Sequence, residues 1–263
     1  MEDFFTEKSI RLISFVGILL IMGGWEILFQ RKKLVDAKPK RWLNNLGLVA
    51  VDNLILQLGF VMLPVTFAAF AQSRGMGIFN QLSLPVWADW IATVIIFDFI
   101  IYLQHVLFHF VPILWRLHQV HHSDLDIDVT TAIRFHPIEI IISLFIKLAA
   151  IAAFGFPPEA VLLFEVLLNA TAMFNHANIY IPTLLDKFIR LLIVTPDMHR
   201  VHHSMIMDES NTNFGFNLSV WDRICGTYQA QPAAGHDRMI IGLEYAKKPK
   251  SFIELLIMPF SKK

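Results

Sequence analysis

Long apolar stretches constrain the fold of this chain more than any other feature of its sequence. A helix that crosses a bilayer needs about 20 predominantly apolar residues. Four segments meet that requirement, namely Ile10–Phe29, Leu46–Ala71, Trp87–Phe110 and Ile138–Phe156. A fifth segment, Ala160–Phe174, is shorter and is either a thin span or a re-entrant segment. The fold class that we predict is all-α: a polytopic integral membrane protein with four or five transmembrane helices.

The composition agrees with a membrane protein and excludes several other classes. Hydrophobic residues make up 55% of the chain and charged residues only 17%, whereas an average soluble domain is about 25% charged. Lys and Arg balance Asp and Glu at 22 each, so we expect no nucleic-acid partner. The single Cys225 excludes an internal disulfide and a cysteine-held zinc or iron–sulfur site. Because the chain starts acidic, at Met1–Asp3, we interpret the first apolar segment as a retained span rather than a signal peptide.

The distribution of basic residues predicts the orientation in the membrane. Residues 31–45, after the first span, hold six Lys or Arg, whereas the loop after the second span holds only Arg74. Short cytoplasmic loops are enriched in Lys and Arg, so residues 31–45 should be cytoplasmic. The third span then reaches the cytoplasm near residue 110. We expect the chain to return there after the fifth segment, so that its histidine clusters form one His-rich cytoplasmic helical cap.

Eight of the 11 histidines fall in three short clusters. The clusters are His105-x3-His109, His118-x2-His121-His122 and His199-x2-His202-His203. Residues three and four apart lie on one face of a helix, so each cluster can direct several imidazoles at one point. Eight ligands exceed what one ion accepts, and we therefore predict two metal ions that share ligands from the three clusters.

The other histidines and two further charged features allow several interpretations. We interpret His176 as a metal ligand rather than as a packed side chain. His136 is either a metal ligand or the cap of the fourth span. His236 lies in a polar tail, and we expect it to be solvated. Lys147 lies inside the fourth span, where it is either functional or a side chain that reaches the interface. The acidic run 124–128 should be a solvated loop edge.

Ligand type alone does not identify the metal, because imidazole suits Zn, Cu, Fe and Ni. The chain contains neither the HExxH motif of zinc proteases nor the Glu-x-x-His motif of soluble di-iron bundles. Two other classes remain open, a membrane haem protein that carries electrons and a metal-binding transporter. Haem uses two axial ligands and leaves the other histidines unexplained, and transporter sites lie near the bilayer midplane.

The histidine clusters stand within longer runs that resemble the fatty acid hydroxylase and sterol desaturase superfamily of membrane oxygenases. The runs are Asp98-Phe-Ile-Ile-Tyr102-x2-His105-x3-His109, Leu114-Trp-Arg-Leu-His118-Gln-Val-His121-His122-Ser123, Arg134-Phe-His136-Pro137-Ile-Glu139, Asn175-His176-Ala-Asn178, Met198-His199-Arg-Val-His202-His203-Ser204 and Trp221-Asp222-Arg223. The resemblance covers roughly residues 95–230. It divides the chain into an N-terminal transmembrane region (1–94), a catalytic region (95–235) and a C-terminal tail (236–263), within one structural domain overall.

The resemblance implies a non-haem di-iron centre, with two Fe ions, that uses O2 to hydroxylate or desaturate a C–H bond of a sterol, fatty acyl or related lipid. The residues that map onto the family's ligand positions are His105, His109, His118, His121, His122, His199, His202 and His203, with His176 as an extra ligand. The side chains that could hydrogen-bond to these ligands are Asp98, His136, Asp197, Asn213 and Asp222, with Asp208 and Asn211 as further candidates.

The electrons for O2 reduction should come from another protein. The chain has no GxGxxG fingerprint, no P-loop and no His-Pro-Gly-Gly haem motif. We therefore expect a separate donor, either a ferredoxin or cytochrome b5 with its reductase. The other partners that we expect are the bilayer and the lipid substrate.

Overall fold

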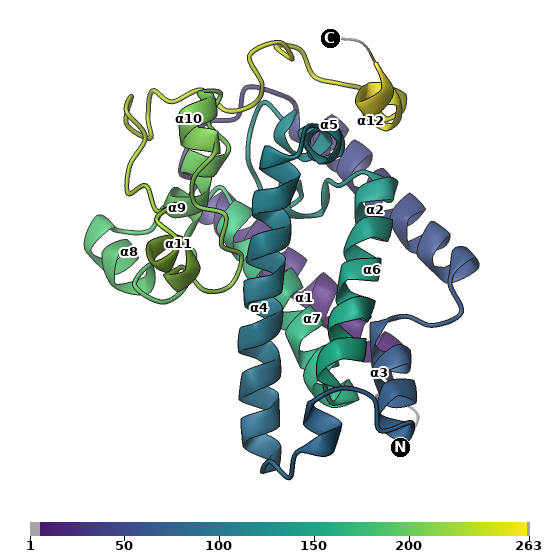
Figure 1. Cartoon of the computed structure of the whole chain (residues 1–263). Helices are drawn as coiled ribbons and strands as arrows, with labels where there is room; N and C mark the ends of the chain where they lie inside the picture. The colour runs from purple at the N-terminus through teal and green to yellow at the C-terminus, as the bar shows by residue number, and fades with distance from the viewer. Residues whose placement is uncertain (1–5, 262–263) are drawn as a thin grey trace.

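A computed structural model describes residues 6–261 and shows a helical protein, with no strand in that range (Figure 1). Its helices are α1 (Glu7–Leu28), α2 (Lys38–Gly59), α3 (Pro64–Ser73), α4 (Val86–Phe110), α5 (Pro112–His122), α6 (Pro137–Phe154), α7 (Pro158–His176), α8 (Thr183–Ile189), α9 (Pro196–His202), α10 (Met207–Ser210), α11 (Val220–Ile224) and α12 (Phe252–Ile257). The all-α prediction is confirmed. The acidic start at Met1–Asp3 lies outside the described residues.

Four segments of the described chain are long and apolar enough to cross a membrane: α1, α2 together with α3, α4, and α6. Between them runs α7, which packs against α1, α3 and α4 and corresponds to the predicted fifth segment (Figure 1). The prediction of four or five transmembrane helices is confirmed. Because α5 and α9 to α12 gather at one end of this bundle, the histidine clusters lie at that end.

The second predicted span is interrupted in the structure. We expected one continuous segment over Leu46–Ala71, but α2 ends at Gly59 and α3 begins at Pro64. Proline lacks a backbone N–H and forces the preceding residue out of the helical region, and Leu63 is extended, with ψ at 169°. The helix therefore stops before Pro64 and restarts with that residue at its first position.

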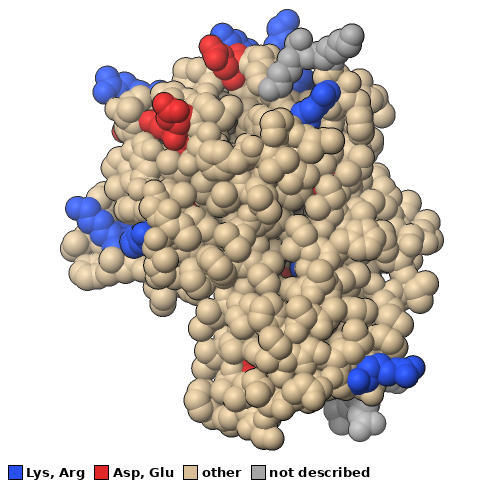
Figure 2. All heavy atoms as spheres, in the orientation of Figure 1, with Lys and Arg blue, Asp and Glu red and all other residues tan. Residues whose placement is uncertain are grey.

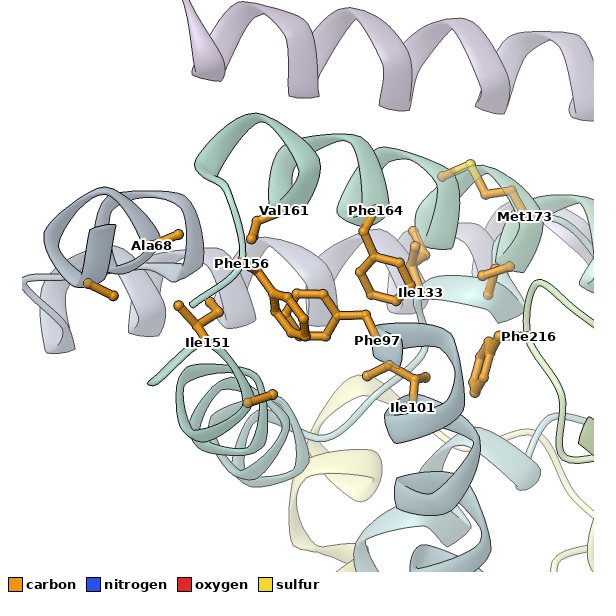
Figure 3. Packing of buried hydrophobic residues seen from close by; sticks show 14 of the residues in the cluster. Ala68, Phe97, Ile101, Ile133, Ile151, Phe156, Val161, Phe164, Met173 and Phe216 are labelled. Carbon is orange, nitrogen blue, oxygen red and sulfur yellow. The ribbon is translucent and has the colours of Figure 1, made fainter. Parts of the chain in front are cut away.

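Aromatic rings form the centre of the bundle core (Figure 3). The ring of Phe97 on α4 lies 4.6 Å from that of Phe156 and 4.8 Å from that of Phe164 on α7. The outward surface is also apolar: Leu20 and Leu58 are 69% and 80% exposed. Figure 2 shows charged side chains toward the end that carries α10 and α12, and a nearly uncharged face around α4 and α6. This pattern is that of a bundle immersed in lipid.

The acidic run is buried, so the prediction of a solvated loop edge was wrong. Arg41 donates from Nε to Asp124 Oδ1 and from Nη1 to Asp128 Oδ2, both at 2.8 Å. Asp126 accepts from the backbone N–H groups of Val35 and Asp36. Burial raises the pKa of Asp124, but Arg41 and Arg134 outweigh it and lower the value to about 2. The run therefore fastens the loop before α2 to the histidine-bearing end.

Candidate metal centre

A proline corner brings the first two histidine clusters together. The long helix α4 ends at Phe110, Val111 is extended, and Pro112 opens α5, which packs across the end of α4. As a result His105 Nε2 lies 3.1 Å from His118 Nε2, and His109 Nε2 lies 3.1 Å from His122 Nε2. Each pair is separated by 13 residues, so one corner sets both contacts.

The third cluster reaches the same place from α9. Thr195 caps this short helix by accepting a hydrogen bond from the N–H of Met198, and Pro196 occupies the first position. His199 and His202 project from α9, and His203 follows at its C-cap. At the end of α7, His176 places its Nε2 3.1 Å from the Nε2 atoms of both His121 and His199.

Nine histidines form two groups, in each of which the candidate ligand atoms lie within 4.8 Å of one another. The first group is His105, His109, His118, His122 and His202, and the second is His121, His176, His199 and His203. All nine side chains are buried. Every histidine of the predicted ligand set is therefore in one of the two groups, and His176 completes the second. His136 and His236 are in neither group.

The hydrogen bonds of the rings fix which nitrogen is free. The Nδ1–H groups of His105, His176 and His202 donate to backbone carbonyls, namely those of Phe214, Ala172 and Thr212, at 2.7–2.8 Å. In each of these rings Nε2 carries the lone pair, and Nε2 is the atom that faces its group. The backbone has thus selected the tautomer that a metal ion requires.

The spacing of the free nitrogens also suits a metal ion. The Nε2 atoms of His202 and His203 are buried and have no hydrogen-bond partner in the part of the chain described, and such atoms are costly. Two ligands at right angles on an ion, with bonds of about 2.1 Å, are about 3.0 Å apart. The four Nε2 contacts in the groups measure 3.1 Å. A cation in each group would provide the missing partner, so the residues fit a metal centre.

Burial keeps these imidazoles in the form that binds metals. It lowers the pKa of His118 to about 3. The histidines outside the long helices whose pKa falls well below the ordinary value, with burial as the largest cause, are His121, His122, His199, His202 and His203. They are neutral at physiological pH, which is the ligating state.

Two predicted supporting carboxylates act on the loop beside His105 rather than on the ring itself. Asp98 does not reach His105, because its oxygens accept from the N–H groups of Leu218 and of the Trp221 indole. Asp222 accepts from the N–H groups of Phe214 and Gly215, at 2.7 and 3.0 Å. Both carboxylates thereby hold the loop that supplies the Phe214 carbonyl to His105.

Asn213 stands between the two carbonyls that bind the histidine rings. Its φ is +54°, a left-handed conformation that asparagine tolerates better than most residues. This turn directs the carbonyls of Thr212 and Phe214 to His202 and His105. The Asn213 amide donates to the carbonyls of Met198 and Gln229 and thereby fixes the loop.

The remaining supporting candidates divide into those that touch a ligand and those that do not. Asn211 accepts from His109 Nδ1 at 3.1 Å. His136 caps α6 by accepting from the N–H of Ile138, in agreement with the capping alternative. Asp197 pairs with Arg31, and Asp208 is exposed. His236 is buried, with its Nε2 3.8 Å from Asp197, so the prediction that it is solvated was wrong.

Glu139 holds a ligand histidine, a role that we did not predict from the sequence. Its Oε1 accepts from His118 Nδ1 at 2.7 Å, and both side chains are almost fully buried. Glu139 belongs to the Arg-Phe-His-Pro-Ile-Glu run, and this was the only signal in the sequence. The backbone carbonyls that orient the other rings leave no such signal, because any residue carries one.

A cavity of about 660 Å³ opens beside the first histidine group. It lies among α1, α2, α4, α6 and α7, and both His105 and His118 form part of its wall. Apolar side chains such as Phe108, Ile133 and Phe216 line the same end. The volume is that of a site for a sizeable organic ligand.

Fold and site together define a helical membrane protein with a buried histidine centre at one end of its bundle and an intramembrane cavity against that centre. The model of the family described as fatty acid hydroxylase matches residues 90–227, more than half of the chain. The chain belongs to the fatty acid hydroxylase family, as its histidine runs predicted.

Similar curated proteins modify lipids. The chain is 33% identical over 170 residues to the ornithine lipid hydroxylase OlsE of Rhizobium tropici, with 64% of the chain and 49% of that protein covered. It is 30% identical over 163 residues to human alkylglycerol monooxygenase, with 59% and 33% covered. It is 26% identical over 181 residues to Arabidopsis thaliana methylsterol monooxygenase 2-2, with 67% of each covered. The match thus spans half or less of the first two relatives. No solved structure matches the chain.

Proposed function

We propose that this protein is an O2-dependent membrane oxidoreductase that hydroxylates or desaturates a lipid at a di-iron centre. The observation that carries the proposal is the pair of buried histidine groups, of five and four imidazoles, the first of which meets a cavity within the membrane-spanning helices. Iron is one of the metals that imidazole ligands suit. The names of the similar proteins, two monooxygenases and a hydroxylase, support oxygen chemistry on a lipid.

The overall reaction consumes one O2, two electrons and two protons. Hydroxylation converts R–H into R–OH and releases one water, whereas desaturation removes two hydrogens from adjacent carbons and releases two waters. When bound, the two irons would supply the oxidising power that an unactivated C–H bond requires. Because the names of the relatives describe hydroxylation or monooxygenation, we favour hydroxylation.

The protein's own residues position and shield the reaction. His105 and His118 present the first group to the cavity, so a lipid carbon in the cavity can come close to that group. Phe135 stacks on His121, with ring centroids 4.6 Å apart and planes 6° apart, and it also lines the cavity. These apolar walls exclude water from the reacting carbon.

The arrangement also supports the predicted orientation and electron supply. The basic loop before α2 lies on the histidine-bearing end, where Arg31 pairs with Asp197 and Lys32 Nζ donates to the Met239 carbonyl. A basic loop of this kind is typical of the cytoplasmic side, so we place the centre there. A ferredoxin or cytochrome b5 with its reductase would deliver the electrons. These contacts support our interpretation that residues 1–94, 95–235 and 236–263 belong to one structural domain.

Metal analysis tests this proposal. Purified protein in mild detergent should contain about two irons per chain and show no Soret band, and the His121→Ala/His202→Ala variant should lose metal from both groups. His236→Asn serves as the control, because His236 is buried but lies outside the groups. A Soret band would instead indicate the haem electron carrier, and full metal retention in the double variant would exclude these histidines as ligands.

A further inference from the structure

Three charged side chains from α1, α6 and α7 meet in one cluster, with exposed fractions of 34% for Arg11, 19% for Lys147 and 10% for Glu165. Glu165 on α7 accepts from Arg11 Nη2 of α1 at 2.5 Å and from Lys147 Nζ of α6 at 2.6 Å. Lys147 is ten residues into an 18-residue helix, so it lies about 15 Å from the histidine-bearing end of α6. It is paired with Glu165 inside the protein instead of reaching the interface.

All three side chains line the same cavity that reaches His105 and His118. Ionisable residues within membrane spans are costly, and those that persist face cavities and mark substrate pathways. The three-residue cluster ties three helices together, but helix packing alone does not require it to face an open space. Its position on the cavity wall indicates contact with a ligand.

The charge at this end of the cavity is positive. Lys8 lies one turn before Arg11 and also lines the cavity, so three cations stand here beside two carboxylates, those of Glu165 and of Glu7, which accepts from Arg11 Nε. Lys147 has three N–H donors, and among the described residues its one acceptor is Glu165. At the other end, by contrast, the wall carries the carboxyl group of Glu139. A ligand with an anionic end therefore fits the cavity in one direction only.

We propose that Lys147 and Arg11, positioned by Glu165, bind the anionic group of the lipid substrate, a carboxylate or a phosphate. This inference rests on the proposed function. Along α6, Lys147 lies eight residues, about 12 Å, beyond the Glu139 that holds His118. Along α7, Glu165 lies eleven residues, about 16 Å, before His176. By holding the anionic end of the lipid at this distance from the histidine groups, the cluster would direct oxidation to a carbon within the lipid's hydrocarbon chain.

A comparison of matched ligands tests the inference. The probes are palmitate, hexadecyl phosphate and hexadecan-1-ol, which share a 16-carbon chain and differ in the anionic group. Binding to the purified full chain in one detergent is measured by displacement of tritiated palmitate. The wild type should bind at least one anionic probe about tenfold or more tighter than the alcohol. Preference for the carboxylate or for the phosphate then identifies the source of the anion.

Variants separate ligand binding from a structural role. Lys147→Met should abolish the preference and leave hexadecan-1-ol binding unchanged, whereas the exposed Lys187→Met on α8 should retain the preference. If Lys147→Met fails to fold, Lys147→Met/Glu165→Gln avoids the excess buried carboxylate, and the same loss is expected. Equal binding of all three probes to the wild type, or a retained preference in the Lys147 variant, would overturn the inference.

The metal content distinguishes the two proposals. Protein that contains about two irons but shows no preference for the anionic probes would contradict the anion site alone. Protein that prefers those probes but binds no iron would contradict the di-iron proposal, and the binding site would stand. In active preparations, mass spectrometry of the product gives a further readout, since loss of Lys147 should spread the oxidised position over several carbons.

Discussion

Replacement of Glu139 should weaken metal binding through His118. The carboxylate accepts from His118 Nδ1–H at 2.7 Å, and the two side chains are only 5% and 2% exposed. A hydrogen bond to a charged group contributes about 1.5–3 kcal/mol, and partners of ligand histidines typically contribute 10–100-fold in metal affinity, or about 1.4–2.7 kcal/mol. Both estimates predict that Glu139→Ala lowers iron affinity by about 10–100-fold.

A graded series tests this explanation. Glu139→Gln keeps an oxygen acceptor and loses only the charge, and neutral hydrogen bonds are about half as strong, so its loss should be about three- to tenfold. Iron retained per chain is measured during dialysis against increasing chelator. Glu159→Gln, in the exposed first turn of α7, is the control. An alanine variant that binds iron within twofold of the wild type would refute the role of Glu139.

Three other predictions concern stability. Asp124→Asn removes one charged partner of the buried Arg41 and should lower the free energy of unfolding by about 3 kcal/mol, measured by thermal unfolding. The exposed control Asp208→Asn should change it little. Equal melting temperatures of the two variants would contradict this prediction. The pKa of His118 is lower in the folded protein than in the unfolded chain, so in metal-free protein the unfolded chain takes up a proton at a higher pH. The free energy of unfolding should therefore fall as the pH is lowered from 6.5 toward about 3, by about 1.4 kcal/mol per pH unit for this histidine. A flat profile of denaturant midpoints would refute the stated direction. Adding Fe(II) back should raise the unfolding free energy by about 2.7 kcal/mol when its concentration is 100 times its dissociation constant, as followed by the melting temperature; no rise would count against a folded-state metal site.

The spacing of histidines along the sequence predicted which of them share one face of a helix. The i, i+3, i+4 pattern placed His118, His121 and His122 on one helix face, and the structure keeps all three in the groups. The division into groups did not follow from spacing: His118 and His122 join the first group and His121 the second. That assignment depends on how α5 crosses α4, which is a tertiary property.

Errors occurred where polar residues found distant partners. The spacing of Asp124 and Asp128 is typical of a solvated loop, and nothing near them in the chain indicates Arg41, more than 80 residues earlier. The burial of His236 also did not follow from the sequence, because its charged neighbour Asp197 lies 39 residues earlier in the chain. A buried ion pair can be predicted from the sequence only when the two residues are already known to lie close together in the fold.

The cavity meets the two histidine groups unequally. Its wall includes His105 and His118, both members of the five-histidine group, and none of the four histidines of the second group. Topology explains the difference, because α4 lines the bundle interior, whereas His176, His199 and His203 come from the end of α7 and from α9, beyond the cavity. In the proposed reaction the lipid carbon therefore approaches the first group. Since that group also contains the His118–Glu139 pair, one of the two histidines on the cavity wall is oriented by a buried carboxylate, whereas His105 on the same wall and His176 of the second group are oriented by backbone carbonyls.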